Sequence, residues 1–180
     1  LVGEEEIAEV LEVLRDGHLY RYGDPDDPKF KRKVHTLERQ FADYIGTQHA
    51  VAVNSGTAAL WISMNAMGIG PGDEVIVPAY TYVATYTAVL FAGATPVLAE
   101  VDDSLTLDLE DAEARITERT KAIVPVHMLG SPARMDALMK LADERGLMVL
   151  EDCAQAAGAA FRGRRVGSFG RMGGFSLNYF

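Results

Sequence analysis

Residues 75–99 read VIVPAYTYVATYTAVLFAGATPVLA and contain no charged side chain. A membrane-spanning helix is one explanation for so long an uncharged stretch. However, Pro78, Gly93, Pro96 and four threonines interrupt it, and its apolar residues fall into shorter runs. We interpret the stretch as a buried strand, a loop, a helix and a second strand. It therefore predicts a strand–helix–strand unit rather than a membrane span.

The same alternation of helical and strand patterns extends from this stretch toward both ends of the chain. Helical spacing marks predicted helices at 7–14, 34–45, 60–67, 86–91, 109–116 and 135–142. Short apolar runs mark predicted strands at 49–53, 75–77, 96–101, 122–126, 147–150 and 174–177. Apolar strands separated by helices are typical of a parallel sheet that is covered on both faces. The sequence therefore predicts an α/β fold, a three-layer, mostly parallel sheet with helices on both faces.

Length, composition and charge narrow the class of protein. The 180 residues are 48% hydrophobic and 24% charged, as in a soluble folded domain, and no linker or repeat divides them. Lys and Arg number 17 against 26 Asp and Glu, and the net charge of −9 argues against binding to nucleic acid or an acidic membrane surface. Cys153 is the single cysteine, which excludes an internal disulfide. With no basic leader around Glu4, Glu5 and Glu6, we expect a cytoplasmic protein.

Polar residues follow predicted strands at three places where a ligand could bind. Ligands of parallel α/β sheets bind beyond the carboxyl ends of the strands. The first segment, Asn54-Ser55-Gly56-Thr57, precedes a predicted helix whose free N–H groups and dipole suit a phosphate. A plain helix cap favours the same residue types. The residues alone therefore leave both a phosphate site and a helix cap open.

The second segment, Glu151-Asp152-Cys153-Ala154-Gln155, follows the predicted strand 147–150. A carboxylate there is costly unless a cation or a hydrogen-bond donor pairs with it, and a protonated pyridine nitrogen is one such partner. The alternative is a capping box, because Asp-x-x-Gln has that pattern. We interpret Cys153 as a packed side chain rather than a nucleophile, since no base lies near it in the sequence.

The third segment, residues 174–180, is a strand with a polar end. His127 follows the predicted strand 122–126 and is a weaker candidate, because a lone histidine there is more often a hydrogen-bonded structural residue. The four histidines and the single cysteine lack the spacing of a zinc site. We therefore predict no bound metal.

A set of motifs, taken in order, resembles one protein family. The motifs are Asn54–Leu60, Gly70–Pro78, Thr81–Thr85, Gly93–Val97, Pro125–His127, Glu151–Gln155 and Gly167–Gly170. Together they resemble the DegT/DnrJ/EryC1/StrS family of pyridoxal-phosphate-dependent sugar aminotransferases, over nearly the whole chain. The resemblance implies that residues 1–180 are the amino-terminal portion and large cofactor-binding domain of PLP fold type I. It also implies that a carboxyl-terminal small domain lies outside this sequence.

The resemblance implies that pyridoxal 5'-phosphate is the cofactor. Gly56, Thr57 and Ser176 would then hold its phosphate, and the positive end of the helix dipole would offset the phosphate charge. Tyr82 would stack on the pyridine ring, because an aromatic face fixes the plane of such a ring.

The same resemblance places Asp152 beside the pyridine nitrogen, which it would keep protonated, and Gln155 near the ring hydroxyl. A protonated pyridine is the electron sink that stabilises a carbanion. The catalytic residue that the family implies is a Schiff-base lysine five residues after Ser176, at position 181, which is outside this sequence. The lysines that are present lie in other segments, so none of them takes that role.

The implied activity is transfer of an amino group from an amino acid, glutamate or glutamine, to a keto-sugar that is nucleotide-linked. A homodimer with shared active sites is implied as well, with no nucleic-acid or membrane partner. One alternative is a sugar dehydratase of the same fold, which works from pyridoxamine phosphate and has histidine at the lysine position. Another is a non-catalytic regulatory or interaction protein on this scaffold, because fold alone does not fix chemistry.

Overall fold

The computed structural model describes residues 2–24 and 26–178. The chain divides into two compact units, residues 1–52 and 53–180. The end of the third polar segment, Tyr179 and Phe180, lies outside the described residues.

Two helices form the first unit, α1 (Glu4–Asp16) and α2 (Lys33–Ile45). Each ends at a glycine in the left-handed region, Gly17 at φ 76° and Gly46 at φ 85°. Glycine adopts this conformation without the steric cost that a side chain would add, which explains why the helices end there. Both helices confirm the predictions from helical spacing.

A five-stranded parallel sheet forms the centre of the second unit. Its strands are β1 (Glu74–Pro78), β2 (Thr95–Ala99), β3 (Thr120–Ile123), β4 (Met148–Asp152) and β7 (Met172–Gly174). Their order across the sheet is β2-β1-β3-β4-β7, and every adjacent pair is parallel. The carboxyl ends of all five strands therefore lie at one edge, with β4 between β3 and β7.

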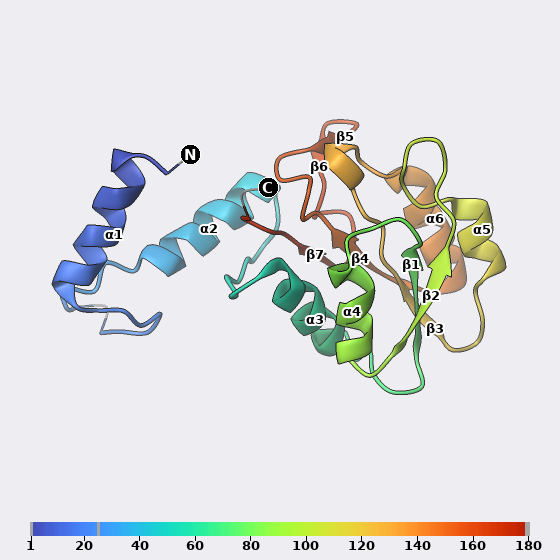
Figure 1. Ribbon diagram of the computed structural model, residues 1–180, viewed down its shortest axis with the longest axis horizontal. Coiled ribbons are helices and arrows are strands. Elements are labelled where there is room, and N and C mark those ends of the chain that lie inside the picture. The colour runs from blue at the N-terminus through green and yellow to red at the C-terminus, as the bar shows by residue number, and fades with distance from the viewer. Residues whose placement is uncertain (1, 25, 179–180) are drawn as a thin grey trace. The chain divides into compact units, whose positions relative to one another are not determined.

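Helices cover both faces of this sheet (Figure 1). The helices α3 (Gly56–Ala66) and α4 (Ala84–Phe91) pack on one face. On the other face lie α5 (Leu109–Ala114) and α6 (Met135–Arg145). The predicted three-layer α/β architecture is confirmed.

Alternate residues of each strand belong to different cores, because successive side chains of a strand point to opposite faces. In β1, Val75 and Val77 pack into the core with Val89 of α4, whereas Ile76 packs with Leu138 of α6. All five side chains are fully buried. Both faces of the sheet are thus apolar, which explains the continuously apolar strand sequences.

Three short elements complete the second unit. They are a 3₁₀ turn, η1 (Met128–Gly130), and the two strands of a hairpin, β5 (Ala160–Phe161) and β6 (Arg164–Arg165). The turn η1 follows the end of β3, and the hairpin lies between β4 and β7 in the sequence.

The uncharged stretch 75–99 folds as β1, a loop, α4 and β2, which confirms the strand–helix–strand prediction. Among the described residues, no helix combines the length and the apolar character that crossing a membrane requires.

Two other predicted strands differ from the structure. The prediction of a buried strand at 49–53 is wrong, because these residues form no strand and Val51 is 65% exposed. A side chain satisfies this backbone instead, since the Ala52 N–H donates to Glu38 Oε1 at 2.8 Å. The last strand is Met172–Gly174 rather than 174–177, because these three residues pair with the end of β4.

Candidate active site

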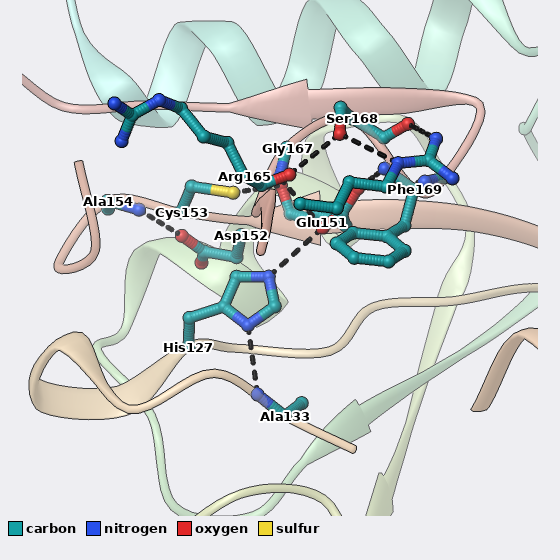
Figure 2. Close-up of polar contacts among 12 residues, drawn as sticks. His127, Ala133, Glu151, Asp152, Cys153, Ala154, Arg165, Gly167, Ser168 and Phe169 are labelled. Atoms are coloured by element: carbon teal, nitrogen blue, oxygen red, sulfur yellow. Dashed lines mark hydrogen bonds and ion pairs between the residues drawn. The ribbon is translucent and has the colours of Figure 1, made fainter. Parts of the chain in front are cut away.

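Asp152, the last residue of β4, is almost completely buried, and Figure 2 shows its carboxyl group with the contact to Ala154. Its side chain accepts two hydrogen bonds, from the Thr85 hydroxyl to Oδ2 at 2.7 Å and from the Ala154 N–H to Oδ1 at 3.1 Å. The residue as a whole is 4% exposed. Thr85 lies in the first turn of α4, so a helix on one face of the sheet reaches the end of its fourth strand.

The charge of the Asp152 carboxylate has no cationic partner of Lys or Arg type among the described residues. Burial raises the pKa of Asp152, while the hydrogen bonds from Thr85 and Ala154 and the nearby His127 act in the opposite direction. An enclosed carboxylate held by neutral donors suits a cation supplied by a ligand. A protonated pyridine nitrogen fits this requirement.

A chain of two hydroxyls supports Asp152 from the loop between β1 and α4. Thr81 Oγ1 and Thr85 Oγ1 are 2.7 Å apart. Because Thr85 donates its single hydroxyl proton to Asp152, Thr81 is the donor to Thr85. Tyr82 lies within this loop, and its carbonyl oxygen accepts the Thr85 N–H at 3.1 Å. The Tyr82 side chain is 68% exposed, which leaves an aromatic face open at this edge of the sheet.

Gly56 and Ser176 come together at the amino terminus of α3. A Cβ atom added to Gly56 would lie 3.0 Å from Ser176 Cβ and 3.4 Å from the Phe175 carbonyl oxygen, so a side chain there would crowd both residues. Ser55 caps the helix by accepting the Ala58 N–H at 3.0 Å. Among the described residues, no hydrogen bond is formed by the Gly56 or Thr57 N–H. The helix thus keeps two free donors at the end where an anion is favoured.

The pairing of β4 with β7 connects the two halves of this site. Asp152 is in register with Gly174, and the Cys153 N–H donates to the Gly174 carbonyl oxygen at 2.8 Å. Ser176 follows Gly174 by two residues. The sheet therefore brings Asp152, Ser176 and the amino terminus of α3 to the same edge.

Gln155 holds the turn that follows β3. Its Oε1 accepts the Leu129 N–H at 3.0 Å, and Leu129 has φ 52°, in the left-handed region. This bond fixes the orientation of the amide, because the oxygen is engaged and the nitrogen remains as a donor. Gln155 is exposed at the same edge of the sheet.

Behind Asp152, on the opposite face of β4, Glu151 and His127 form a buried polar network (Figure 2). Glu151 Oε2 accepts the Gly167 N–H at 2.7 Å and lies 3.2 Å from His127 Nε2. Glu151 Oε1 accepts the N–H groups of Phe169 and Gly170, both at 2.7 Å. One fully buried carboxylate therefore has four partners, and three of them are backbone amides.

The comparison with known proteins identifies the family. The profile of the DegT/DnrJ/EryC1/StrS aminotransferase family matches residues 1–179. The chain belongs to this family. Pyridoxal 5'-phosphate is the cofactor on which members of the family depend.

Curated relatives of this family are similar along most of the chain. The spore coat polysaccharide biosynthesis protein SpsC of Bacillus subtilis (strain 168) is 45% identical over 178 residues, which are 98% of this chain and 43% of the relative. The dTDP-3-amino-3,4,6-trideoxy-alpha-D-glucose transaminase of Streptomyces venezuelae is 54% identical over 142 residues, 78% of this chain and 38% of the relative. The chain thus spans less than half the length of these proteins.

Solved structures of the family share the fold. The aminotransferase from Psychrobacter cryohalolentis has a TM-score of 0.90 and 38% identity, covering 97% of this chain and 43% of that chain. The GDP-4-keto-6-deoxymannose-3-dehydratase ColD, as its H188N mutant, has a TM-score of 0.77 and 35% identity, covering 81% of this chain and 40% of that chain. These likenesses confirm PLP fold type I for this family member.

His127, Glu151 and Cys153 offer ligand atoms that lie within 4.8 Å of one another, a grouping that the sequence spacing did not indicate. Hydrogen bonds occupy this group, however. His127 Nδ1 accepts the Ala133 N–H at 3.1 Å, and its Nε2 faces Glu151. Burial, with the charges of Glu151 and Asp152, raises the pKa of the Cys153 thiol. Neither ring nitrogen has a lone pair to spare, and a protonated thiol is a poor ligand.

The structure brings several of the predicted site residues to one edge of the sheet and adds two others, Thr85 and Glu151. Gly56 meets Ser176, and Asp152 lies on the strand next to the one that leads to Ser176. The sequence analysis missed Thr85 and Glu151, whose roles depend on contacts across 67 and up to 24 residues. It also treated His127 as a lone side chain. The Thr81–Thr85 spacing of one helical turn was the only sequence signal that could have drawn attention to Thr85.

Proposed function

We propose that the full-length protein containing this chain is a pyridoxal-phosphate-dependent aminotransferase. It moves an amino group from an amino acid, glutamate or glutamine, to a keto-sugar that is nucleotide-linked. The observation that carries this proposal is Asp152, an enclosed carboxylate without a cationic partner at the edge of the sheet where α3 presents free N–H groups. Family membership and the sugar transaminase among the relatives support the substrate class.

The residues of this chain would divide the binding of the cofactor among them. The Gly56 and Thr57 N–H groups and the Ser176 hydroxyl would bind the phosphate, with the helix dipole opposing its charge. Gly56 leaves the space between α3 and Ser176 that a side chain would fill. Tyr82 would cover one face of the ring.

Asp152 and Gln155 would contact two different polar groups of the pyridine ring. Asp152 would accept a hydrogen bond from the protonated ring nitrogen and favour the protonated form, while Thr85 keeps the Asp152 carboxylate oriented. The Gln155 amide nitrogen would donate near the ring hydroxyl, since Leu129 engages its oxygen. When bound, the protonated ring supplies the electron sink for a carbanion.

Two further features of the whole protein belong to this proposal. A homodimer is supported by large apolar side chains exposed on α3 and α4, where the rings of Trp61 and Phe91 meet edge to face with centroids 6.2 Å apart. A cytoplasmic location is supported by the single cysteine, Cys153, which is free and buried.

Borohydride reduction of the full-length protein, followed by peptide mapping across position 181, tests the cofactor and the lysine together. A lysine there that carries the reduced cofactor supports the proposal. Asp152→Asn should keep the fold and lower the rate of amino transfer by about 100-fold or more, because the ring nitrogen loses its anionic partner. Asp143→Asn, on the exposed face of α6, is the matched control. Full activity of Asp152→Asn would overturn the role of Asp152 and point to another site, whereas a wild-type protein without transaminase activity would favour the non-catalytic alternative.

A dehydratase is the second candidate, favoured by the structural likeness to ColD. The same mapping separates the two activities, because a histidine at position 181 would replace the lysine. Product analysis distinguishes them as well, since amino transfer leaves an amino group on the sugar and dehydration removes a hydroxyl.

A further inference from the structure

Glu151 faces away from the candidate cofactor site, although it is the neighbour of Asp152 in β4. Leu150 belongs to the core under α3 and α4, and Val149 belongs to the core under α6. Asp152 therefore points to the α4 side, where Thr85 meets it, and Glu151 points to the α6 side. There Glu151 is fully buried and receives its four hydrogen bonds.

The tautomer of His127 follows from its two partners. Its Nδ1 accepts the Ala133 N–H at 3.1 Å, so this nitrogen carries no proton. The ring proton is then on Nε2, 3.2 Å from Glu151 Oε2, and His127 is a neutral donor to the carboxylate. Every partner of the Glu151 side chain is thus a donor, and a protonated Glu151 would have no acceptor for its own proton.

These donors belong to two chain segments that adjoin cofactor residues. His127 precedes the turn η1 that Gln155 holds, and its backbone N–H donates to the Asp152 carbonyl oxygen at 3.1 Å. The segment 167–170 leads directly into β7 and then to Ser176. It lies tightly on β4, because a Cβ atom on Gly170 would be 2.5 Å from the Val149 carbonyl oxygen.

We propose that Glu151 is a positioning residue for the cofactor site, and that its carboxylate joins two segments to the strand bearing Asp152: the one that leads into the turn held by Gln155, and the one that leads to Ser176. Glu151 touches neither the cofactor nor the substrate. It sets the distance between the phosphate-binding end of the site and the ring-binding end, because the segments that support both ends are hydrogen-bonded to one side chain. This inference rests on the proposed function for the ligand, but the network itself does not depend on it.

Glu151→Gln is the variant that removes this role with the least change in shape. An amide has one acceptor oxygen, so its nitrogen must face two of the four donors. These are either the Gly167 N–H and the His127 Nε2–H or, with the amide turned round, the N–H groups of Phe169 and Gly170. His127 cannot turn to the other tautomer, because a proton on Nδ1 would then face the Ala133 N–H. The substitution therefore leaves a clash of donors that no local proton shift relieves.

The experiment uses the full-length protein and titrates it with pyridoxal phosphate. We expect Glu151→Gln to raise the dissociation constant about 10- to 100-fold, the range known for outer-shell partners of metal ligands and for unpaired buried donors. The amides of 167–170 should exchange hydrogen faster in the unliganded variant. Glu118→Gln, on the surface, is the control and should match the wild type. A Glu151→Gln protein that binds as tightly as this control overturns the proposal.

A destabilised control separates positioning from general stability. Leu138→Ala removes a fully buried side chain from the core on the same face of the sheet, without touching the Glu151 network. If it lowers the melting temperature as much as Glu151→Gln but leaves the dissociation constant unchanged, positioning is supported. Equal weakening of binding by both variants overturns it.

Measurements on the wild type keep the proposal falsifiable if Glu151→Gln does not fold. Nitrogen NMR of the His127 ring should show the proton on Nε2, and the Phe169 and Gly170 amides should be protected without cofactor. A proton on Nδ1, or rapid exchange of these amides, overturns the network. Failure of the wild type to bind pyridoxal phosphate would instead overturn the proposed function, and would leave these two measurements unchanged.

Discussion

Thr85 donates from its hydroxyl to Asp152 across 2.7 Å, and this bond joins the first turn of α4 to the end of β4. Both residues are buried. Thr81 engages the remaining side of the Thr85 hydroxyl, so the donor direction is fixed before any ligand arrives. Because burial alone would favour a neutral carboxyl, this hydroxyl chain helps Asp152 to stay charged in an enclosed place.

Thr85→Val should therefore weaken the binding of pyridoxal phosphate by the full-length protein about tenfold or more, the value of a hydrogen bond to a charged group. The pKa of Asp152 should rise further, because burial raises this pKa and the hydrogen bond from Thr85 is the main contact that lowers it. Equilibrium titration with pyridoxal phosphate, followed by absorbance, measures the change in affinity. Thr87→Val is the control, because Thr87 lies two residues further along α4 and its hydroxyl donates to the Val83 carbonyl oxygen; this variant should bind the cofactor normally. Normal binding by Thr85→Val would contradict the assigned role.

Gly56→Ala should weaken cofactor binding while leaving the fold intact. The added Cβ would lie 3.0 Å from Ser176 Cβ, so the two elements that hold the phosphate must move apart by a few tenths of an ångström. We expect an affinity loss on the order of tenfold and a small change in melting temperature. Gly70→Ala is the matched control, because its Cβ would meet nothing nearer than the Ala92 carbonyl oxygen at 3.9 Å. Equal affinities of the two alanine variants would argue against a phosphate site at α3.

Glu74 should make the free energy of unfolding depend on pH. Hydrogen bonds from Thr117 and Arg119 hold the pKa of Glu74 below its ordinary value, with Arg119 Nε 2.9 Å from Glu74 Oε1. The unfolded chain then binds a proton more readily, so stability rises with pH through the window between the folded and unfolded pKa values and falls as acid protonates Glu74.

Arg119→Gln should consequently lower the free energy of unfolding at neutral pH, and its difference from the wild type should shrink as the pH falls below the pKa of folded Glu74. Urea unfolding over a series of pH values measures both effects. Lys140→Gln, which breaks an exposed pair with Glu144, should cause little change at any pH. A difference that stays constant in acid would contradict the pairing with Glu74.

Cys153 should resist alkylation in the native protein. Its side chain is fully buried, and burial first, then the charges of Glu151 and Asp152, raises the pKa of its thiol. Since the thiolate is the reactive form, iodoacetamide should label the Cys153 peptide only after denaturation. Mass spectrometry of that peptide reports the extent of labelling. Rapid native labelling would show that the end of β4 opens in solution.

The sequence was a good guide where the physics is local. Helical spacing and terminal glycines predicted α1 and α2, and the broken uncharged stretch predicted β1, α4 and β2. The strand predicted at 49–53 failed because an apolar run does not reveal whether a neighbouring strand is present. There, the Glu38 side chain takes the Ala52 N–H instead.

The roles of the site residues stay predictions, but the sequence did indicate the position of Asp152, because the end of an apolar strand can be predicted from a local pattern. The position of Asp152 after a buried run indicated a carboxylate in need of a partner, and the structure shows it buried at the end of β4. The sequence could not show which neutral groups donate hydrogen bonds to the buried carboxylate. Thr85 lies 67 residues away, and the amides that surround Glu151 belong to glycines and a phenylalanine whose side chains reveal nothing about their N–H groups.

β4 ends in two adjacent carboxylates whose hydrogen-bond donors lie on opposite faces of the sheet. A slip of this strand by one residue would turn Glu151 to the face that bears Thr85 and Asp152 to the opposite face, so that the two carboxylates could not both meet hydrogen-bond donors there. Both carboxylates would be displaced by the same slip. A strand in the wrong register therefore cannot keep the hydrogen bonds of one carboxylate while losing those of the other. The paired acids therefore help to fix the register of β4 in the sheet, and an insertion or deletion within 148–152 would remove this constraint.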